Sequence, residues 1–263
     1  MKIDFLASGA APEKAKSVYV LLHGIGSGAA SWQNQLAATQ GNQIVSVLAW
    51  NAPGYVGSLP LGEPHPTASD YAKRLWQWLE TLRIQTPLTL VGHSLGALIA
   101  TSATLQKPSL VKRLVLLAPA LGYGDEPAIS QEKVVNQRLG NLRELGVTGM
   151  AKARAPAMLS ANASASQIQM VQDVMSQLHP AGYEQAVRML STGHLIADLA
   201  KLQIENKEIV IDVACGSADS ITPPQKCALA AKAANTQLID LGAVGHVCAL
   251  EGHSAVNHLL GIV

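Results

Sequence analysis

Short runs of apolar residues, rich in leucine and β-branched side chains, recur along the chain between longer and more mixed segments. Each run is almost wholly apolar and does not alternate with polar residues, which is typical of parallel strands covered on both faces. The sequence therefore predicts six strands, at residues 18–22, 44–49, 88–91, 114–118, 209–214 and 237–241.

Segments with a helical pattern lie between these runs, and prolines at positions 87, 108 and 223 mark several of the boundaries. The helical candidates are residues 68–83, 95–106, 224–235 and 252–260. Strands that alternate with helices in this order favour an α/β fold with a mainly parallel sheet.

The interval between the runs at 114–118 and 209–214 breaks this rhythm, because it holds about 90 residues without a strand-like run, too many for a structureless loop in a compact domain. It is rich in Ala, Gln, Ser and Met, and glycines and prolines interrupt its short helical segments. We therefore expect a helical insertion over the sheet, in which flexible methionines either pack the insertion onto the body or cover a nonpolar ligand. The predicted division is a core of residues 1–121 and 195–263 and a cap of residues 122–194.

The strongest chemical signal is the sequence Gly92-His93-Ser94-Leu95-Gly96, which follows an apolar strand and precedes a helix-like stretch. This is the setting of a nucleophile elbow, where a tight turn exposes a serine hydroxyl above the sheet. Both glycines are expected because a side chain at either position would collide with the neighbouring helix or strand. Ser94 is therefore the candidate nucleophile, and His93 is interpreted as a packing residue.

A serine hydroxyl needs a base, and in chains of this type the acid and then the histidine follow the serine. Asp219 and His246 each come just after a predicted strand, so both should reach the same rim of the sheet as Ser94. Asp212 and Asp240 are weaker candidates for the acid. His194, near the end of the insertion, is a candidate substrate-binding residue that could equally be a hydrogen-bonded residue of the cap.

The turn after the strand at 18–22 contains several glycines, and its backbone N–H groups can face the rim. We expect the N–H of Ile25 and the N–H of Leu95 to form an oxyanion hole, with Gly24 and Gly26 beside the substrate. Dinucleotide binding is disfavoured, because the turn lacks the last glycine of Gly-x-Gly-x-x-Gly and no acidic residue follows at the required spacing.

Four motifs in this order make the chain resemble the α/β-hydrolase fold superfamily. They are residues 23–26, residues 50–55, residues 92–96 and the pair Asp219 and His246. The resemblance implies a mainly parallel central sheet flanked by helices, with a helical cap inserted after the sixth strand. It also implies that Ser94 is the nucleophile, His246 the base and Asp219 its orienting partner. One departure is Asn51, where the superfamily usually has Asp, and we expect this residue to brace a loop.

The serine nucleophile disfavours haloalkane dehalogenation, since the dehalogenases that resemble this pattern carry Asp in its place. The resemblance to 3-oxoadipate enol-lactonases and to ring-cleavage-product hydrolases is about equal. We therefore expect a carboxylic ester hydrolase acting on a small ester or lactone. The alternatives are C–C bond hydrolysis of a diketone-like ring-cleavage product and a non-catalytic small-molecule receptor. Between residues 133 and 188 the cap carries six basic and three acidic residues, which permits an anionic substrate without establishing one.

Composition narrows the remaining classes of function. With 19 Lys and Arg against 18 Asp and Glu, the chain carries no electrostatic footprint for nucleic acid. It also lacks an apolar run long enough for a membrane span. Three cysteines in no Cys-x-x-Cys pair are interpreted as reduced, buried thiols, so we expect a cytoplasmic protein. The sequence has no His, Cys or carboxylate cluster at zinc spacing, and we expect neither a metal nor another cofactor. A monomer or a homodimer is expected.

Overall fold

The computed structural model describes residues 2–262, and its centre is a single seven-stranded sheet. The strand order is β1-β3-β2-β4-β5-β6-β7; β1 runs antiparallel to β3, and every other neighbouring pair is parallel. The strands are β1 (Phe5–Gly9), β2 (Ser17–Leu22), β3 (Val45–Trp50), β4 (Leu88–His93), β5 (Val111–Leu117), β6 (Val210–Cys215) and β7 (Leu238–Asp240).

All six predicted strands are present within a few residues of their expected bounds, and the predicted α/β-hydrolase fold is confirmed. The apolar runs are apolar because both faces of the sheet are covered, and every residue of β4 is buried. β1 was not predicted. It is an edge strand that is largely exposed, so its sequence has no apolar run.

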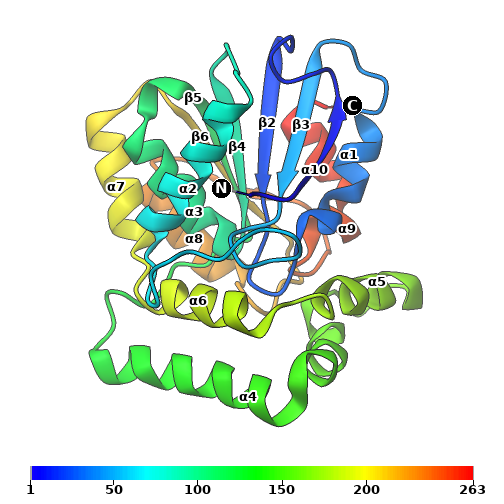
Figure 1. Ribbon diagram of the computed structural model, residues 1–263, viewed down its shortest axis with the longest axis vertical. Helices are drawn as coiled ribbons and strands as arrows, with labels where there is room; N and C mark the ends of the chain where they lie inside the picture. The colour runs from blue at the N-terminus through cyan, green and yellow to red at the C-terminus, as the bar shows by residue number, and fades with distance from the viewer. Residues whose placement is uncertain (1, 263) are drawn as a thin grey trace.

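Helices cover the two faces of the sheet in separate layers (Figure 1). One face packs against α2 (Ala68–Thr81), α3 (Leu95–Gln106), α7 (Leu195–Glu205) and α8 (Pro224–Ala233). The other face packs against α10 (His253–Leu260) and the shorter elements η1 (Ala29–Trp32), α1 (Gln33–Ala38) and α9 (Cys248–Glu251). A one-turn helix, η2 (Pro108–Leu110), precedes β5.

The chain between β5 and β6 forms the predicted helical insertion. Its helices are α4 (Ala128–Arg154), η3 (Pro156–Met158), α5 (Ala165–Met175) and α6 (Pro180–Ser191), followed by α7, which packs on the body. Figure 1 shows α4, α5 and α6 below the sheet, across the ends toward which the parallel strands point. The insertion follows the fifth of the seven strands in residues 2–262, so its strand number is one lower than the resemblance implies. We call residues 122–194 the cap segment.

The longest helix of the cap segment is bent. Gly146 has φ +64° and ψ 177°, values that a helical residue does not adopt, so α4 consists of two helical pieces that meet at this residue. In Figure 1 the longer piece runs along the lower edge of the molecule, and the chain then turns up toward α5.

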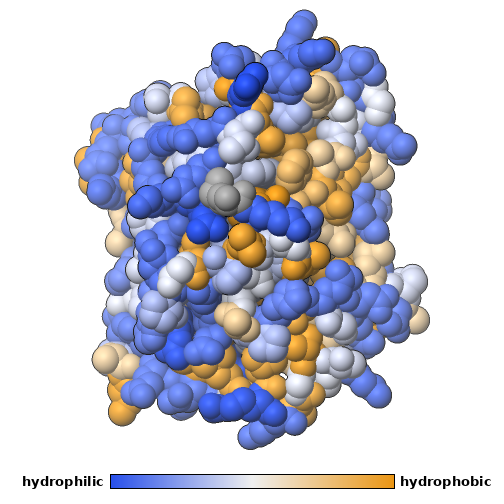
Figure 2. Space-filling model, in the orientation of Figure 1, coloured by the Kyte–Doolittle hydropathy of each residue, from blue (hydrophilic) through white to orange (hydrophobic). Residues whose placement is uncertain are grey.

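The face of the molecule that Figure 2 shows is mainly hydrophilic. Hydrophilic residues cover most of it, and hydrophobic residues gather right of centre, near the edge of the sheet formed by β1 and β3. Among residues 2–262, no helix combines the length and the apolar character that crossing a membrane requires.

Candidate active site

Ser94 lies in the turn between β4 and α3 with φ +53° and ψ −114°, a conformation that L-residues rarely adopt. Its backbone is held on both sides: the N–H donates to Leu117 O at 3.0 Å, and the carbonyl accepts from the N–H of Ala120 at 3.1 Å. The strain at Ser94 is therefore maintained by hydrogen bonds to the last residue of β5 and to the loop that follows it.

The two glycines around Ser94 are required by close packing. A Cβ on Gly92 would lie 2.5 Å from the carbonyl oxygen of Gly96, and a Cβ on Gly96 would overlap the carbonyl of Leu22 on β2. The turn thus brings α3 against the sheet more closely than any side chain permits, which is the reason predicted for this motif.

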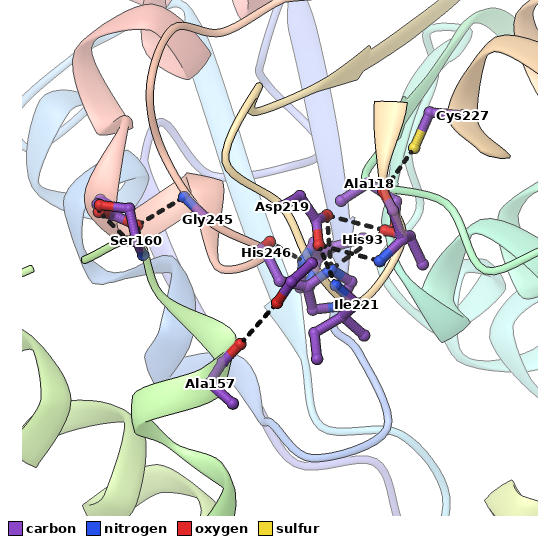
Figure 3. Close-up of polar contacts among 12 residues, drawn as sticks. His93, Ala118, Ala157, Ser160, Asp219, Ile221, Cys227, Gly245 and His246 are labelled. Carbon is purple, nitrogen blue, oxygen red and sulfur yellow. Dashed lines mark hydrogen bonds and ion pairs between the residues drawn. The ribbon is translucent and has the colours of Figure 1, made fainter. Parts of the chain in front are cut away.

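His246 and Asp219 form a buried pair at the ends of neighbouring strands, β7 and β6. His246 Nδ1 lies 2.9 Å from Asp219 Oδ2 (Figure 3). The carboxylate is itself oriented by a local turn, because its Oδ1 accepts from the N–H of Ile221 at 2.8 Å and from the N–H of Thr222 at 2.9 Å. Since Nδ1 donates to the carboxylate, Nε2 of His246 is left as the basic nitrogen.

Opposing effects act on the pKa of Asp219. Burial alone would raise the pKa of this carboxyl, but hydrogen bonds from His246 and Thr222 and the charge of a protonated His246 outweigh burial, so the pKa lies below its usual value. Asp219 is therefore ionised at neutral pH and stabilises a positive charge on the imidazole.

Thr222 is a component of this group that sequence reasoning missed. Its hydroxyl lies 2.9 Å from Asp219 Oδ2, 3.2 Å from His246 Nδ1 and 3.0 Å from the carbonyl of Ala118. The available signal was its position three residues after Asp219, where the backbone and hydroxyl of a threonine can bind the carboxylate of a turn.

His93 supports the backbone of His246. Its Nε2 donates to the carbonyl of His246 at 2.8 Å, and the two rings lie 4.8 Å apart (Figure 3). Burial lowers the pKa of His93 to about 3, with a further contribution from His246, so the ring is neutral. The geometry thus places His93 behind His246, in agreement with its interpretation as a packing residue.

The loop after β2 is tied to the loop after β3 by a second buried histidine. His23 accepts from the N–H of Ala52 through Nε2 at 3.0 Å and donates through Nδ1 to Gly24 O at 2.8 Å. Burial lowers its pKa to about 4, which keeps it neutral and preserves this pattern. Asn51 braces the same region by accepting from the N–H of Ala29 at 2.8 Å, and it donates to Asp4.

The loop that holds Ile25 lies close to Ser94. A Cβ on Gly24 would lie 3.1 Å from Ser94 Cβ, and the carbonyl of Ile25 accepts from the hydroxyl of Tyr55 at 2.8 Å, which fixes this part of the loop. Leu95 is the first residue of α3, where an amide has no partner within its own helix.

A cavity of about 340 Å³ brings most of the predicted residues together. Its wall includes Ser94 and His246, and Asp219 lies behind His246. Gly24, Ile25, Gly26 and Leu95 also line it, as do Met158 and Met170 of the cap segment. In residues 2–262 the hydroxyl of Ser94 makes no direct hydrogen bond to His246, a separation that often closes only when substrate binds.

His194 is the predicted site residue that the structure places elsewhere. Its Nδ1 lies 2.8 Å from Asp125 Oδ1, nearly half of its side chain is exposed, and it does not line the cavity. The two weaker candidates for the acid bind other groups than His246. Asp212 pairs with Arg113, and Asp240 accepts from the N–H of Gly242. Within the described residues, no group of three or more His, Cys, Asp or Glu side chains could hold a metal ion.

Comparison with known proteins agrees with this architecture. The family model described as the alpha/beta hydrolase family matches residues 19–258, and the chain belongs to that family. A putative carbamate hydrolase RutD from Klebsiella pneumoniae is 27% identical over 260 residues, which cover 95% of this chain and 92% of that protein. Against the first curated relatives, the chain spans only 28% to 36% of their length.

Solved structures show the same fold at low sequence identity. An esterase from Thermogutta terrifontis superposes with a TM-score of 0.81 at 16% identity, covering 98% of this chain and 91% of that one. An enol-lactonase from Burkholderia xenovorans gives a TM-score of 0.80 at 19% identity, with 98% and 95% covered.

Proposed function

We propose that the protein is a serine hydrolase that cleaves a small carboxylic ester or lactone through an acyl-enzyme. The observation that carries the proposal is that Ser94, on a strained turn, and the buried His246–Asp219 pair meet at one cavity under the cap segment. The names of the structural neighbours, an esterase and an enol-lactonase, support the same chemistry.

In the proposed mechanism, Ser94 Oγ attacks the substrate carbonyl while His246 Nε2 accepts its proton. Asp219 holds the tautomer of His246 and stabilises the imidazolium. The N–H groups of Ile25 and Leu95 donate to the oxyanion of the tetrahedral intermediate. His246 then protonates the leaving alkoxide, and a water molecule deprotonated by His246 releases the acid from Ser94.

A fluorophosphonate probe tests the nucleophile directly. Intact mass should show one adduct on the wild-type protein and none on Ser94→Ala, while Ser31→Ala, which removes another serine of the cavity wall, should retain the adduct. Ser94→Ala should also lower kcat on a p-nitrophenyl ester by about 10⁴- to 10⁶-fold. An adduct that persists in Ser94→Ala would exclude Ser94 as the nucleophile.

A substrate panel then defines the scope of the reaction. It should contain simple esters, lactones and a coloured ring-cleavage product. Aryl carbamates are added because the relative from Klebsiella pneumoniae, which matches 95% of this chain, is described as a putative carbamate hydrolase. Turnover of the ring-cleavage product alone would assign C–C bond hydrolysis to the same residues. A folded wild-type protein that forms no adduct and turns over none of these compounds would contradict the proposal.

A further inference from the structure

Two arginines of the cap segment, Arg138 and Arg154, lie in the wall of the same cavity as Ser94. Neither guanidinium forms an ion pair or a hydrogen bond with a protein group in residues 2–262, and Nη1 of Arg138 is buried without any partner. The acidic residue Glu126 also lines the cavity, but it is exposed and pairs with neither arginine. The wall also includes Lys226, which is exposed to solvent. The two arginines of the cap segment are therefore positive charges that no protein carboxylate neutralises within residues 2–262.

The electrostatics of these arginines are unfavourable in the protein alone. Burial lowers the pKa of Arg154, and the positive charge of Arg138 lowers it further, so the two groups are close enough to repel each other. Cations removed from water without a partner destabilise a protein, and buried charges are normally paired. An anion located between the two guanidinium groups would remove both penalties.

The bend of α4 creates this pair. Arg138 lies in the first helical piece and Arg154 at the end of the second, so a straight helix would separate them by about 24 Å along its axis. The bend at Gly146 instead brings both side chains to one cavity. The bent helix thus places both guanidinium groups at one cavity, although the two arginines are 16 positions apart in the sequence.

We propose that Arg138 and Arg154 bind a carboxylate carried by the substrate, so that the preferred substrates are esters or lactones of dicarboxylic acids that keep one acid group free. Guanidinium groups match the planar, two-oxygen geometry of a carboxylate. Met158, Met170 and Val171 form an apolar part of the remaining wall, which suits the short carbon chain between the two ends. This inference rests on the proposed function, because it assumes that the reacting carbonyl lies at Ser94.

The test compares matched pairs of substrates. Mono-p-nitrophenyl esters of succinate, glutarate and adipate, each with a free acid group, are measured against the same compounds with the acid methylated. We expect the wild-type protein to have a higher kcat/KM for the free acid of at least one pair. Arg138→Gln and Arg154→Gln should each lower the ratio of the two kcat/KM values by about 10- to 100-fold, the effect of losing a hydrogen bond to a charged group.

Arg143→Gln is the matched control. Arg143 lies on the same helix, is exposed and lines a different groove, so its replacement removes the same charge and should leave the ratio at the wild-type value. Equal ratios in the wild-type protein and in all three variants, with labelling at Ser94 intact, would overturn the carboxylate site and leave the proposed function standing.

A second measurement does not depend on turnover. Calorimetric titration measures the affinity of Ser94→Ala for monomethyl glutarate and monomethyl adipate. Adding Arg138→Gln to this variant should lower the affinity at least tenfold. Arg138→Met should also raise the thermal midpoint of the ligand-free protein, because it removes a partly buried charge whose Nη1 has no partner. Unchanged binding together with a lowered thermal midpoint would assign Arg138 a structural role and overturn the inference even if no ester is hydrolysed.

Discussion

The carboxylate of Glu251 joins the cap segment to the loop that holds His246. Its Oε2 accepts from the N–H of Gly245 at 2.8 Å and from the N–H of Ser160 at 3.0 Å, and the hydroxyl of Ser160 bonds to Oε1 (Figure 3). The N–H of Val247 also donates to the carbonyl of Met158 at 3.1 Å. The position of His246 therefore depends on contacts with the cap segment as well as on Asp219.

We predict that Glu251→Ala lowers both stability and turnover. The replacement leaves the amides of Gly245 and Ser160 without their acceptor, which should reduce the free energy of unfolding by about 2 kcal/mol. It should also lower kcat more than it raises KM, since the residue positions His246 and does not contact the substrate. Urea unfolding and steady-state kinetics check this, with the exposed Glu205→Ala as control. A stability loss with unchanged kcat would show that Glu251 only anchors the cap segment.

The two buried histidines make stability depend on pH. His23 and His93 have pKa values of about 4 and about 3, below the value of about 6.5 of an unfolded chain, because burial disfavours their charged forms. As the pH falls from 6.5 toward 4, the unfolded state therefore takes up two protons that the folded state does not. Their contribution to stability is complete above pH 6.5 and is lost on acidification, by about 2.7 kcal/mol per pH unit in this range.

Urea unfolding at closely spaced pH values between 7 and 4.5 checks this dependence. His93→Gln retains a donor for the carbonyl of His246. It should reduce the slope by about half, since only His23 then takes up a proton on unfolding. His65→Gln, at an exposed position, should leave the slope at the wild-type value. A slope that His93→Gln does not change would mean that His93 is protonated in the folded protein.

Much of the body could be predicted from the sequence because its signals are local. Buried parallel strands produce unbroken apolar runs, and the turn around Ser94 requires glycines at two fixed positions. Ser94, Asp219 and His246 each follow such a run, so the order of the strands alone brings them to one rim.

Features that depend on long-range contacts could not be predicted in this way. The exposed edge strand β1 has no apolar pattern, and the link between Glu251 and Ser160 joins residues 91 positions apart. The sequence shows an excess of basic residues in the cap, but it does not indicate that Arg138 and Arg154 share a cavity, because their proximity depends on the bend of α4 at Gly146. His194 was expected near the substrate, yet its loop directs it to Asp125.

We predict opposite effects of alanine at two glycines of α4. Gly146 has φ +64°, so Gly146→Ala should destabilise the protein by about 1–3 kcal/mol through backbone strain alone, since no atom lies near its added Cβ. Gly140 also has open space and lies in regular helix, so Gly140→Ala should stabilise the protein by about 0.4–1 kcal/mol. Thermal unfolding checks both changes, and a neutral Gly146→Ala would mean that the bend of α4 is not fixed by its backbone.

Replacing the acid of the proposed triad should impair turnover while the fold is kept. Asp219→Asn preserves the shape of the side chain but no longer holds Nδ1 of His246 as a donor, so the imidazole can present the wrong tautomer to Ser94. The neutral amide also no longer stabilises the positive charge that the imidazole acquires during the reaction. We expect kcat on a p-nitrophenyl ester to fall by about 10⁴-fold with a small change in KM. Asp240→Asn is the matched control, because Asp240 is the last residue of β7 and its side chain accepts from the N–H of Gly242. It should retain wild-type kcat. Stopped-flow kinetics on both variants, with circular dichroism to verify folding, distinguish the two aspartates, and equal activity of Asp219→Asn and the wild-type protein would remove Asp219 from the proposed mechanism.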